Sequence, residues 1–159
     1  MNQNARKAES ERQVFLTFIE RSGFSVIRQS IRSGRAAFRE SDIVCNDADG
    51  SELGFELSRV ADPDLTRAIN RRDPKNGEYM RLGGHSHRWL REKLGKSYSI
   101  TGVQLLLYRE NIGTPDNILV PQLRLQVRRR HIYSKIWYMG KDAVQVLYDR
   151  QPSGRANLA

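Results

Sequence analysis

Cysteine is nearly absent from this sequence, and its scarcity excludes a domain held together by disulfides. The single cysteine, Cys45, has no partner for an internal disulfide, so nothing marks the chain as secreted. Its apolar neighbours Ile43 and Val44 indicate a buried core thiol rather than a nucleophile. No apolar run is long enough to cross a membrane, and residues 1–13 lack the apolar core of a signal peptide. We therefore expect a cytoplasmic protein with no membrane partner.

Several familiar catalytic and metal-binding motifs are also missing. The sequence has no Ser-His-Asp arrangement, no glycine-rich phosphate loop and no dinucleotide fingerprint. His85 and His87 lie close together, but no cysteine or third histidine stands at zinc-finger spacing. We expect these two histidines to contact phosphate or solvent at the start of a helix.

Positive charge is what the chain has in excess. It carries 27 Lys and Arg against 18 Asp and Glu, a net charge of +9 over 159 residues. Such a surface attracts polyanions, above all nucleic acid, although a basic ribosomal protein, a membrane-surface protein or a merely soluble basic surface would look similar. Arginine outnumbers lysine, and its planar guanidinium suits paired contacts with phosphate. Three groups stand out: Arg32, Arg35 and Arg39; Arg67, Arg71 and Arg72; Arg128, Arg129 and Arg130.

The apolar pattern predicts a single mixed α/β domain over residues 1–150, with a central β-sheet flanked by helices and a flexible tail at 151–159. Strand-helix-strand connections call for parallel pairing within that sheet. The expected helices cover residues 8–22, 62–72, 83–95 and 114–130, with Pro121 starting or kinking the last of them. The expected strands cover residues 24–28, 38–46, 50–60 and 100–110, the last buried on both faces, followed by a hairpin over 135–149. We expect the link at 29–39 to be a loop.

Two carboxylates stand out on adjacent predicted strands. Asp49-Gly50 is a strong turn signal between the strand that carries Asp42 and the strand that carries Glu56. Alternate residues of a strand share a face, so Glu56 and Ser58 point to the same side. The pairing register decides whether the two carboxylates converge, and the sequence leaves it open.

Converging carboxylates in a basic chain suit a divalent metal ion held against a phosphodiester. Mg²⁺ and Mn²⁺ are hard cations that proteins bind through one or two carboxylates together with water. Such an ion generates a nucleophilic hydroxide and neutralises charge on the phosphate. The structural alternative stays open: Asp42 would cap a turn or pair with Arg39, and Glu56 would pair with an arginine.

The order of elements, with these residues placed on it, resembles the PD-(D/E)XK nucleases, the restriction-endonuclease-like superfamily. The resemblance covers roughly residues 9–109, as a helix, a three-stranded meander, a helix and a further strand. Ser41-Asp42 stands where the family has Pro-Asp, and Glu56-Leu57-Ser58 stands where it has (D/E)XK. Glu11 matches an acidic residue that many members carry on the first helix.

The resemblance implies a restriction-endonuclease-like core and metal-dependent phosphodiester hydrolysis. Asp42 and Glu56 are then the ligands of Mg²⁺ or Mn²⁺, and Glu11 gives outer support, although for Glu11 a structural role at the helix start is preferred. Ser58 replaces the family's lysine, which orients the attacking water and stabilises developing charge. Either a basic residue of the following segment substitutes for that lysine, or the site is degenerate. The candidate substitutes are Arg67, Arg71 and Lys75.

The sequence therefore predicts an endonuclease that acts on nucleic acid, with DNA favoured. The first arginine group borders the expected site and is the favoured nucleic-acid surface, joined by the second, whereas the third is interpreted as a solvated helix end. One alternative is a catalytically degenerate nucleic-acid-binding module of the same fold. Another is a structural or regulatory interaction protein with Trp89, Trp137 and Tyr138 as surface anchors, although burial in the core is preferred for them. A homodimer is left open.

Overall fold

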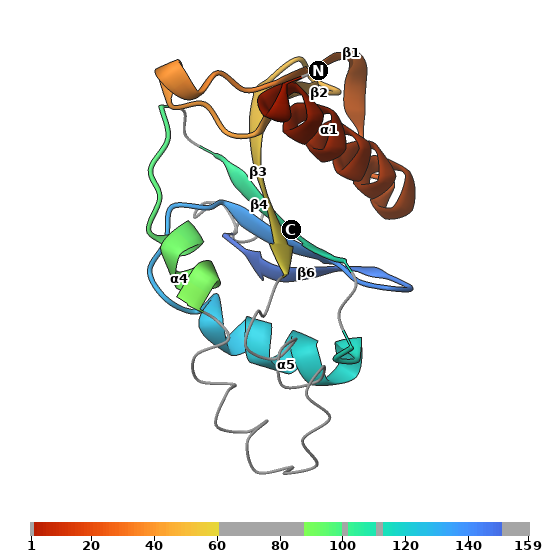
Figure 1. Ribbon diagram of the computed structural model, residues 1–159, viewed down its shortest axis with the longest axis vertical. Coiled ribbons are helices and arrows are strands. Elements are labelled where there is room, and N and C mark those ends of the chain that lie inside the picture. The colour runs from red at the N-terminus through yellow and green to blue at the C-terminus, as the bar shows by residue number, and fades with distance from the viewer. Residues whose placement is uncertain (1, 61–87, 100–101, 111–112, 151–159) are drawn as a thin grey trace, which may run out of the picture.

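The computed structural model describes residues 2–60, 88–99, 102–110 and 113–150 (Figure 1). These residues confirm an α/β fold with a six-stranded mixed sheet. The elements are α1 (Gln3–Ser22), β1 (Val26–Ser33), the 3₁₀ helix η1 (Ala36–Phe38), β2 (Ile43–Asp47), β3 (Glu52–Val60), α4 (Arg88–Leu94), β4 (Gln104–Arg109), α5 (Asp116–Gln126), β5 (Lys135–Met139) and β6 (Val144–Asp149).

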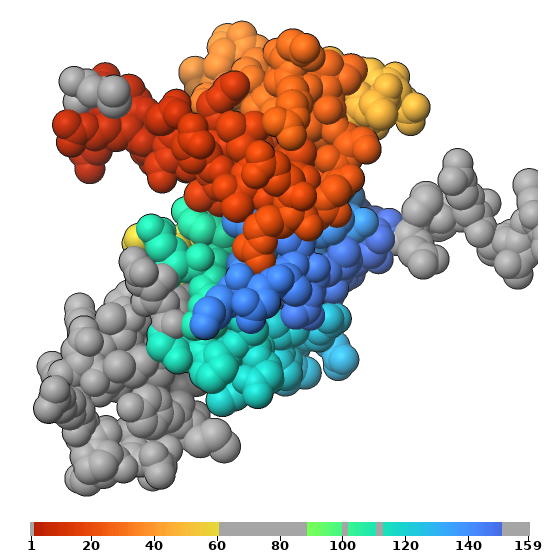
Figure 2. Space-filling view, turned by 90° about the vertical axis from the view of Figure 1, so that its right-hand side faces the viewer, coloured from red at the N-terminus to blue at the C-terminus, as the bar shows by residue number. Residues whose placement is uncertain are grey.

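The strands lie in the sheet in chain order, from β1 to β6. β1, β2 and β3 form an antiparallel meander, β3, β4 and β5 are parallel, and β5 and β6 form an antiparallel hairpin. Helix α1 covers one face of the sheet, and α4 and α5 lie on the opposite face (Figure 1). From the side, the β5–β6 hairpin lies between α1 and α5, and the first turns of α1 project from the body (Figure 2). The expected parallel pairing and terminal hairpin are confirmed.

Each face of the sheet has its own apolar core. Beneath α1, the ring of Phe15 packs against Phe55 of β3, with ring centroids 4.9 Å apart. Helices α4 and α5 cover the second core on the other face. In β4, Leu105 and Leu107 belong to the second core and Leu106 to the first, and all three are fully buried. The expectation that this strand is buried on both faces is therefore confirmed.

The single cysteine and the aromatic residues considered as surface anchors are packed in or against these cores. Cys45 is buried, and burial raises the pKa of its thiol to about 11, as befits a core residue. Trp137 and Tyr138 are buried as well, and Trp137 Nε1 donates to Gln104 Oε1 at 2.7 Å. Trp89 of α4 is partly buried against the second core. These aromatic residues stabilise the fold and are not exposed surface anchors.

The first helix and the first strand are both longer than expected. α1 begins at Gln3 rather than at residue 8 because Asn2 caps it, its side-chain oxygen accepting a hydrogen bond from Ala5 N at 2.8 Å. β1 continues to Ser33, through residues expected to form a loop. The reason is that Ile31 joins the core beneath α1, which holds the segment on the sheet.

Helix α5 is shorter than the expected 114–130, and Pro121 lies inside it. Proline has no N–H to donate within a helix, and the helix ends with Val127 N donating to Leu123 O at 3.0 Å. The arginines of residues 128–130 are exposed and follow the end of the helix directly, so the boundary at 130 was too late while their interpretation as a solvated helix end still fits.

Some expected elements cannot be compared with the structure. Residues 62–72, 83–87 and 151–159, which were expected to form a helix, the start of α4 and a tail, lie outside the described residues. Within the described ranges, none of the helices combines the length and the apolar character needed to cross a membrane.

Gly34 brings the end of β1 against the segment that precedes β2. Its N–H donates to Asp42 O at 2.9 Å. A Cβ at position 34 would overlap the carbonyl oxygen of Ser41, so the close approach of the two backbones requires glycine. This contact holds the backbone that carries Asp42.

We predict that Gly34→Ala destabilises the fold by about 1–3 kcal/mol, because the added methyl group must push the Ser41 carbonyl aside. Gly95→Ala is the matched control, since its Cβ would meet backbone oxygens only at an ordinary 3.6 Å. Urea unfolding measures both free energies. Equal stabilities for the two variants would contradict a tight contact between Gly34 and the segment before β2.

Candidate functional site

The pairing of β2 with β3 brings the two predicted metal ligands near each other, although Asp42 directly precedes β2 and is not part of it. Ile43 pairs with Phe55, and extending this antiparallel register by one residue puts Asp42 opposite Glu56. Asp42 Oδ2 accepts a hydrogen bond from Leu57 N at 2.9 Å, which fixes the carboxylate against β3. Phe55 and Leu57 face the core beneath α1, so Glu56 points to the opposite face, toward α4.

Glu56 is a buried carboxylate held by two lysines. Its side chain is only 3% exposed, and its Oε1 accepts hydrogen bonds from Lys93 Nζ at 2.6 Å and from Lys96 Nζ at 2.9 Å. Burial opposes ionisation, but the two ammonium groups outweigh it and hold the pKa of Glu56 below its ordinary value. Glu56 is therefore ionised at neutral pH, and its ion-pair partners among the described residues are lysines rather than an arginine.

Asp42 is partly buried beside this charge. Burial raises the pKa of Asp42, and the negative charge of Glu56 raises it further, against the opposing hydrogen bond from Leu57 N. Two neighbouring carboxylates that disfavour each other's ionisation are stabilised by a cation between them. The chemistry of this oxygen donor pair fits a hard divalent cation.

Glu11 of α1 lies in the same region of negative charge. Burial raises the pKa of Glu11, and the charge of Asp42 and, more weakly, that of Glu56 add to the shift. Its carboxylate is 3.4 Å from Lys7 Nζ. The described residues contain no group of three or more His, Cys, Asp or Glu that could hold a metal ion. A cation at Asp42 and Glu56 would thus take its other ligands from water and phosphate, as Mg²⁺ commonly does.

The basic groups beside Glu56 come from the helix predicted over residues 83–95 and the turn after it, which the sequence did not connect with the site. Ser58 is buried on the face that Glu56 shares, as strand alternation requires. Lys93 and Lys96 follow Glu56 by 37 and 40 positions, and no local pattern shows that α4 folds back over β3. A signal was present in their spacing of three, which puts both on one side of a helical turn.

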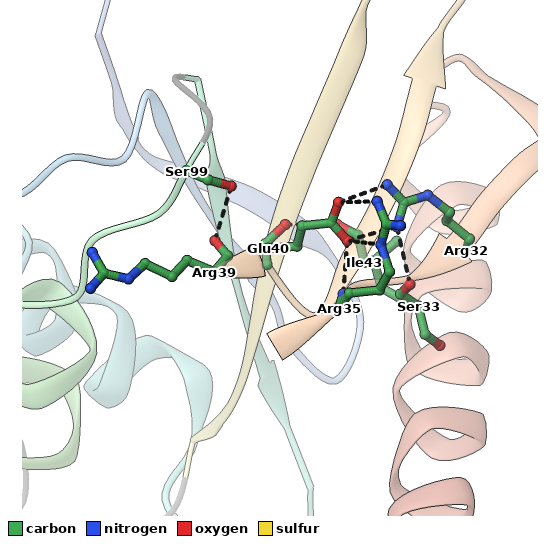
Figure 3. Close-up of polar contacts among 8 residues, drawn as sticks. Arg32, Ser33, Arg35, Arg39, Glu40, Ile43 and Ser99 are labelled. Carbon is green, nitrogen blue, oxygen red and sulfur yellow. Dashed lines mark hydrogen bonds and ion pairs between the residues drawn. The ribbon is translucent and has the colours of Figure 1, made fainter. Parts of the chain in front are cut away.

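The first arginine group is partly engaged with a carboxylate. Figure 3 shows the Glu40 carboxylate facing the guanidinium groups of both Arg32 and Arg35, with N–O distances of 2.8 and 3.1 Å. Hydrogen bonds from Arg32 and Arg35 hold the pKa of Glu40 far below its ordinary value. The side chain of Arg39 extends away from this cluster (Figure 3), and its carbonyl accepts a hydrogen bond from Ser99 N at 3.1 Å. A phosphate would have to compete with Glu40 for Arg32 and Arg35.

The second arginine group and the two neighbouring histidines remain untested by the structure. These residues and Lys75, a candidate substitute for the missing lysine, lie outside the described residues, so their expected roles stay predictions. They are Arg67, Arg71, Arg72, Lys75, His85 and His87.

Comparison with known proteins gives no match to a family model, to a curated protein or to a solved structure. Membership of the nuclease superfamily therefore stays a prediction. It rests on the order of the elements and on the residues of the site.

We predict that Lys93→Met destabilises the protein by about 1–3 kcal/mol at neutral pH, because the buried Glu56 charge loses its closer partner. The pKa of Glu56 is lower in the folded protein than its ordinary value of 4.5. The ionised carboxylate therefore contributes its full stabilisation at pH values above 4.5, and this stabilisation is lost as the pH falls through the folded-state pKa. The difference between native protein and variant should therefore shrink on acidification. Unfolding free energies between pH 7 and pH 3 measure it.

Lys96→Met is the control for this experiment. Lys96 is 48% exposed against 24% for Lys93, so its loss should cost less. A Lys93→Met effect that is independent of pH would show that the lysine contributes packing and not charge.

Proposed function

We propose that this protein is a metal-dependent nuclease that hydrolyses phosphodiester bonds in nucleic acid, with DNA as the favoured substrate. The observation that carries the proposal is the convergence of Asp42 and Glu56 in the β2–β3 register, with the Lys93 ammonium 2.6 Å from Glu56 Oε1. An acidic pair with a lysine beside it, on a chain of net charge +9, suits the handling of a phosphodiester.

The arrangement of the elements supports the same proposal. α1 is followed by the β1–β3 meander, then by α4, and then by β4 parallel to β3. This is the order implied by the resemblance to the PD-(D/E)XK nucleases, and it favours a restriction-endonuclease-like core.

Asp42 and Glu56 would hold Mg²⁺ or Mn²⁺, which when bound supplies a nucleophilic hydroxide and neutralises charge on the phosphate. Burial of Glu56 keeps bulk water away from its carboxylate, which strengthens the electrostatic interactions there. Glu11 adds negative charge nearby and increases the attraction for a cation.

Lys93 takes the role of the lysine that the (D/E)XK pattern would place at position 58. An ammonium group donates hydrogen bonds to water or to a phosphate oxygen and stabilises the negative charge that develops during hydrolysis. Lys93 reaches Glu56 from α4, on the face that Glu56 shares with Ser58. The substitution of Ser58 for lysine is thereby compensated from another element.

A catalytically degenerate nucleic-acid-binding module is the second candidate, and one observation favours it. Glu56 Oε1 accepts hydrogen bonds from two ammonium groups, which stabilises its buried charge without a metal ion. The carboxylates would then have a structural role, and the excess of basic residues would supply binding.

We predict that DNA cleavage requires Mg²⁺ or Mn²⁺ and falls by more than about 100-fold in Asp42→Asn and Glu56→Gln. Changing a group that merely supports a metal ligand already costs about 10–100-fold, and these residues would be the ligands. Nicking of supercoiled plasmid, with and without a chelator, measures the effect.

Glu52→Gln is the matched control, because Glu52 is an exposed acid at the far end of the same strand. It should leave cleavage unchanged. Native protein that binds DNA but neither cleaves it nor binds Mn²⁺ by calorimetry would contradict the nuclease and leave the binding module.

We predict that Lys93→Met lowers kcat by roughly 100-fold with little change in KM, because the ammonium acts on charge that develops in the transition state. Adding Ser58→Lys to this variant should restore part of the loss, since position 58 shares the face of Glu56. Ser58→Met on the same background is the control, with a side chain of similar length and no charge. Full activity of Lys93→Met under conditions where it stays folded would remove Lys93 from the mechanism.

A further inference from the structure

A second polar feature lies beside Tyr98. It is a cavity of about 420 Å³, lined by Tyr98, Gly102, Arg130, His131 and Arg150 among others. Two arginines contribute to this lining, and its described residues contain no carboxylate. A cavity with this lining attracts an anion.

The arginines of the cavity are more available than those of the first group. Arg130 is exposed and makes no ion pair or side-chain hydrogen bond with the described residues. Arg150 donates from one terminal nitrogen to His131 O at 3.1 Å, a contact that positions its guanidinium without neutralising it. By contrast, Glu40 binds both Arg32 and Arg35. A phosphate entering the cavity would meet uncompensated positive charge.

His131 adds a nitrogen that responds to bound charge. Its Nε2 lies 3.1 Å from the carbonyl oxygen of Val127, which can only accept, so Nε2 carries the proton. Its Nδ1 is buried and has no hydrogen bond of ordinary geometry with the described residues, although the backbone of Tyr133 lies near enough to raise the pKa of the ring. Burial lowers the pKa of His131 and the charge of Arg150 lowers it further, against the hydrogen bond to Val127 O. An anion near Arg150 would reverse part of that shift.

The cavity connects with the acidic pair through a short series of contacts. Tyr133 OH donates its single proton to Lys93 O at 2.8 Å. In the 3.1 Å contact between the two tyrosine hydroxyls, Tyr98 OH is therefore the donor and Tyr133 OH the acceptor. Lys93 Nζ in turn donates to Glu56. Tyr98, which lines the cavity, therefore belongs to the same set of contacts as Glu56.

We infer that this cavity binds a phosphate group of the nucleic-acid strand that flanks the cleaved bond, with Arg130 and Arg150 as its ligands. This inference rests on the proposed function for the identity of the strand, but the binding itself needs no cleavage. Guanidinium groups suit the site because their planar donors pair with phosphate oxygens. The contact adds affinity and fixes the position of the strand without reading its sequence.

The test compares Arg130→Gln with Arg129→Gln, which removes the same charge from an exposed neighbouring residue that does not line the cavity. Binding of a short single-stranded oligonucleotide is measured by fluorescence anisotropy over a range of salt concentrations, with a chelator present so that nothing is cleaved. Each lost phosphate contact to a single strand should reduce the slope of log K against log salt by about 0.7. Arg130→Gln should show this reduction and Arg129→Gln should not.

A second readout uses inorganic phosphate as the probe. In the native protein, NMR titration should show the pKa of His131 rising as phosphate is added, and Arg130→Gln should abolish the rise. Equal salt slopes for the two variants, or a His131 pKa that phosphate does not move, would overturn the inference. If the two variants have equal salt slopes but the native protein cleaves DNA, the phosphate site is wrong and the proposed nuclease stands. If only Arg130→Gln reduces the slope and the native protein does not cleave DNA, the phosphate site stands and the nuclease is wrong.

Discussion

The buried charge of Glu56 is the constraint on which the arrangement around the site depends. A carboxylate that is 3% exposed is costly to bury unless cations meet it. Lys93 and Lys96 meet this need, and both come from α4 and the turn that follows it. The apolar side of α4 points the same way, because Leu90 and Leu94 are buried in the core on that face. Charge pairing and apolar burial thus place α4 over β3 together.

Features that depend on short-range pattern could be predicted from the sequence. The turn at Asp49-Gly50 forms as expected, with Gly50 at a φ of 84° and its N–H donating to Asp47 O at 3.0 Å. The alternation of apolar and polar residues correctly separates Leu57 from Glu56 across the faces of β3. Both follow from local rules, since a turn type selects its residues and strand geometry repeats every second residue.

Features that depend on how distant segments meet could not be predicted in this way. The register that puts Asp42 opposite Glu56 depends on which β2–β3 pairing buries the apolar face, and the arrival of Lys93 depends on the packing of a helix far along the chain. Composition identified arginine as abundant, but it could not show that Glu40 would bind Arg32 and Arg35. That contact needs the turn at η1, and no periodic pattern in residues 29–39 indicates such a turn.

The contacts at the end of α1 have a consequence for the order in which the protein matures on the ribosome. Arg21 donates to Gly140 O at 2.9 Å across 119 positions, and Phe18 packs edge-on against Trp137 with ring centroids 5.2 Å apart. A nascent chain can form α1 early, because a helix needs local contacts alone, but the apolar side of α1 stays partly uncovered until β5 has emerged. The core beneath α1, the helix that carries Glu11, is thus completed only after β5 has left the ribosome.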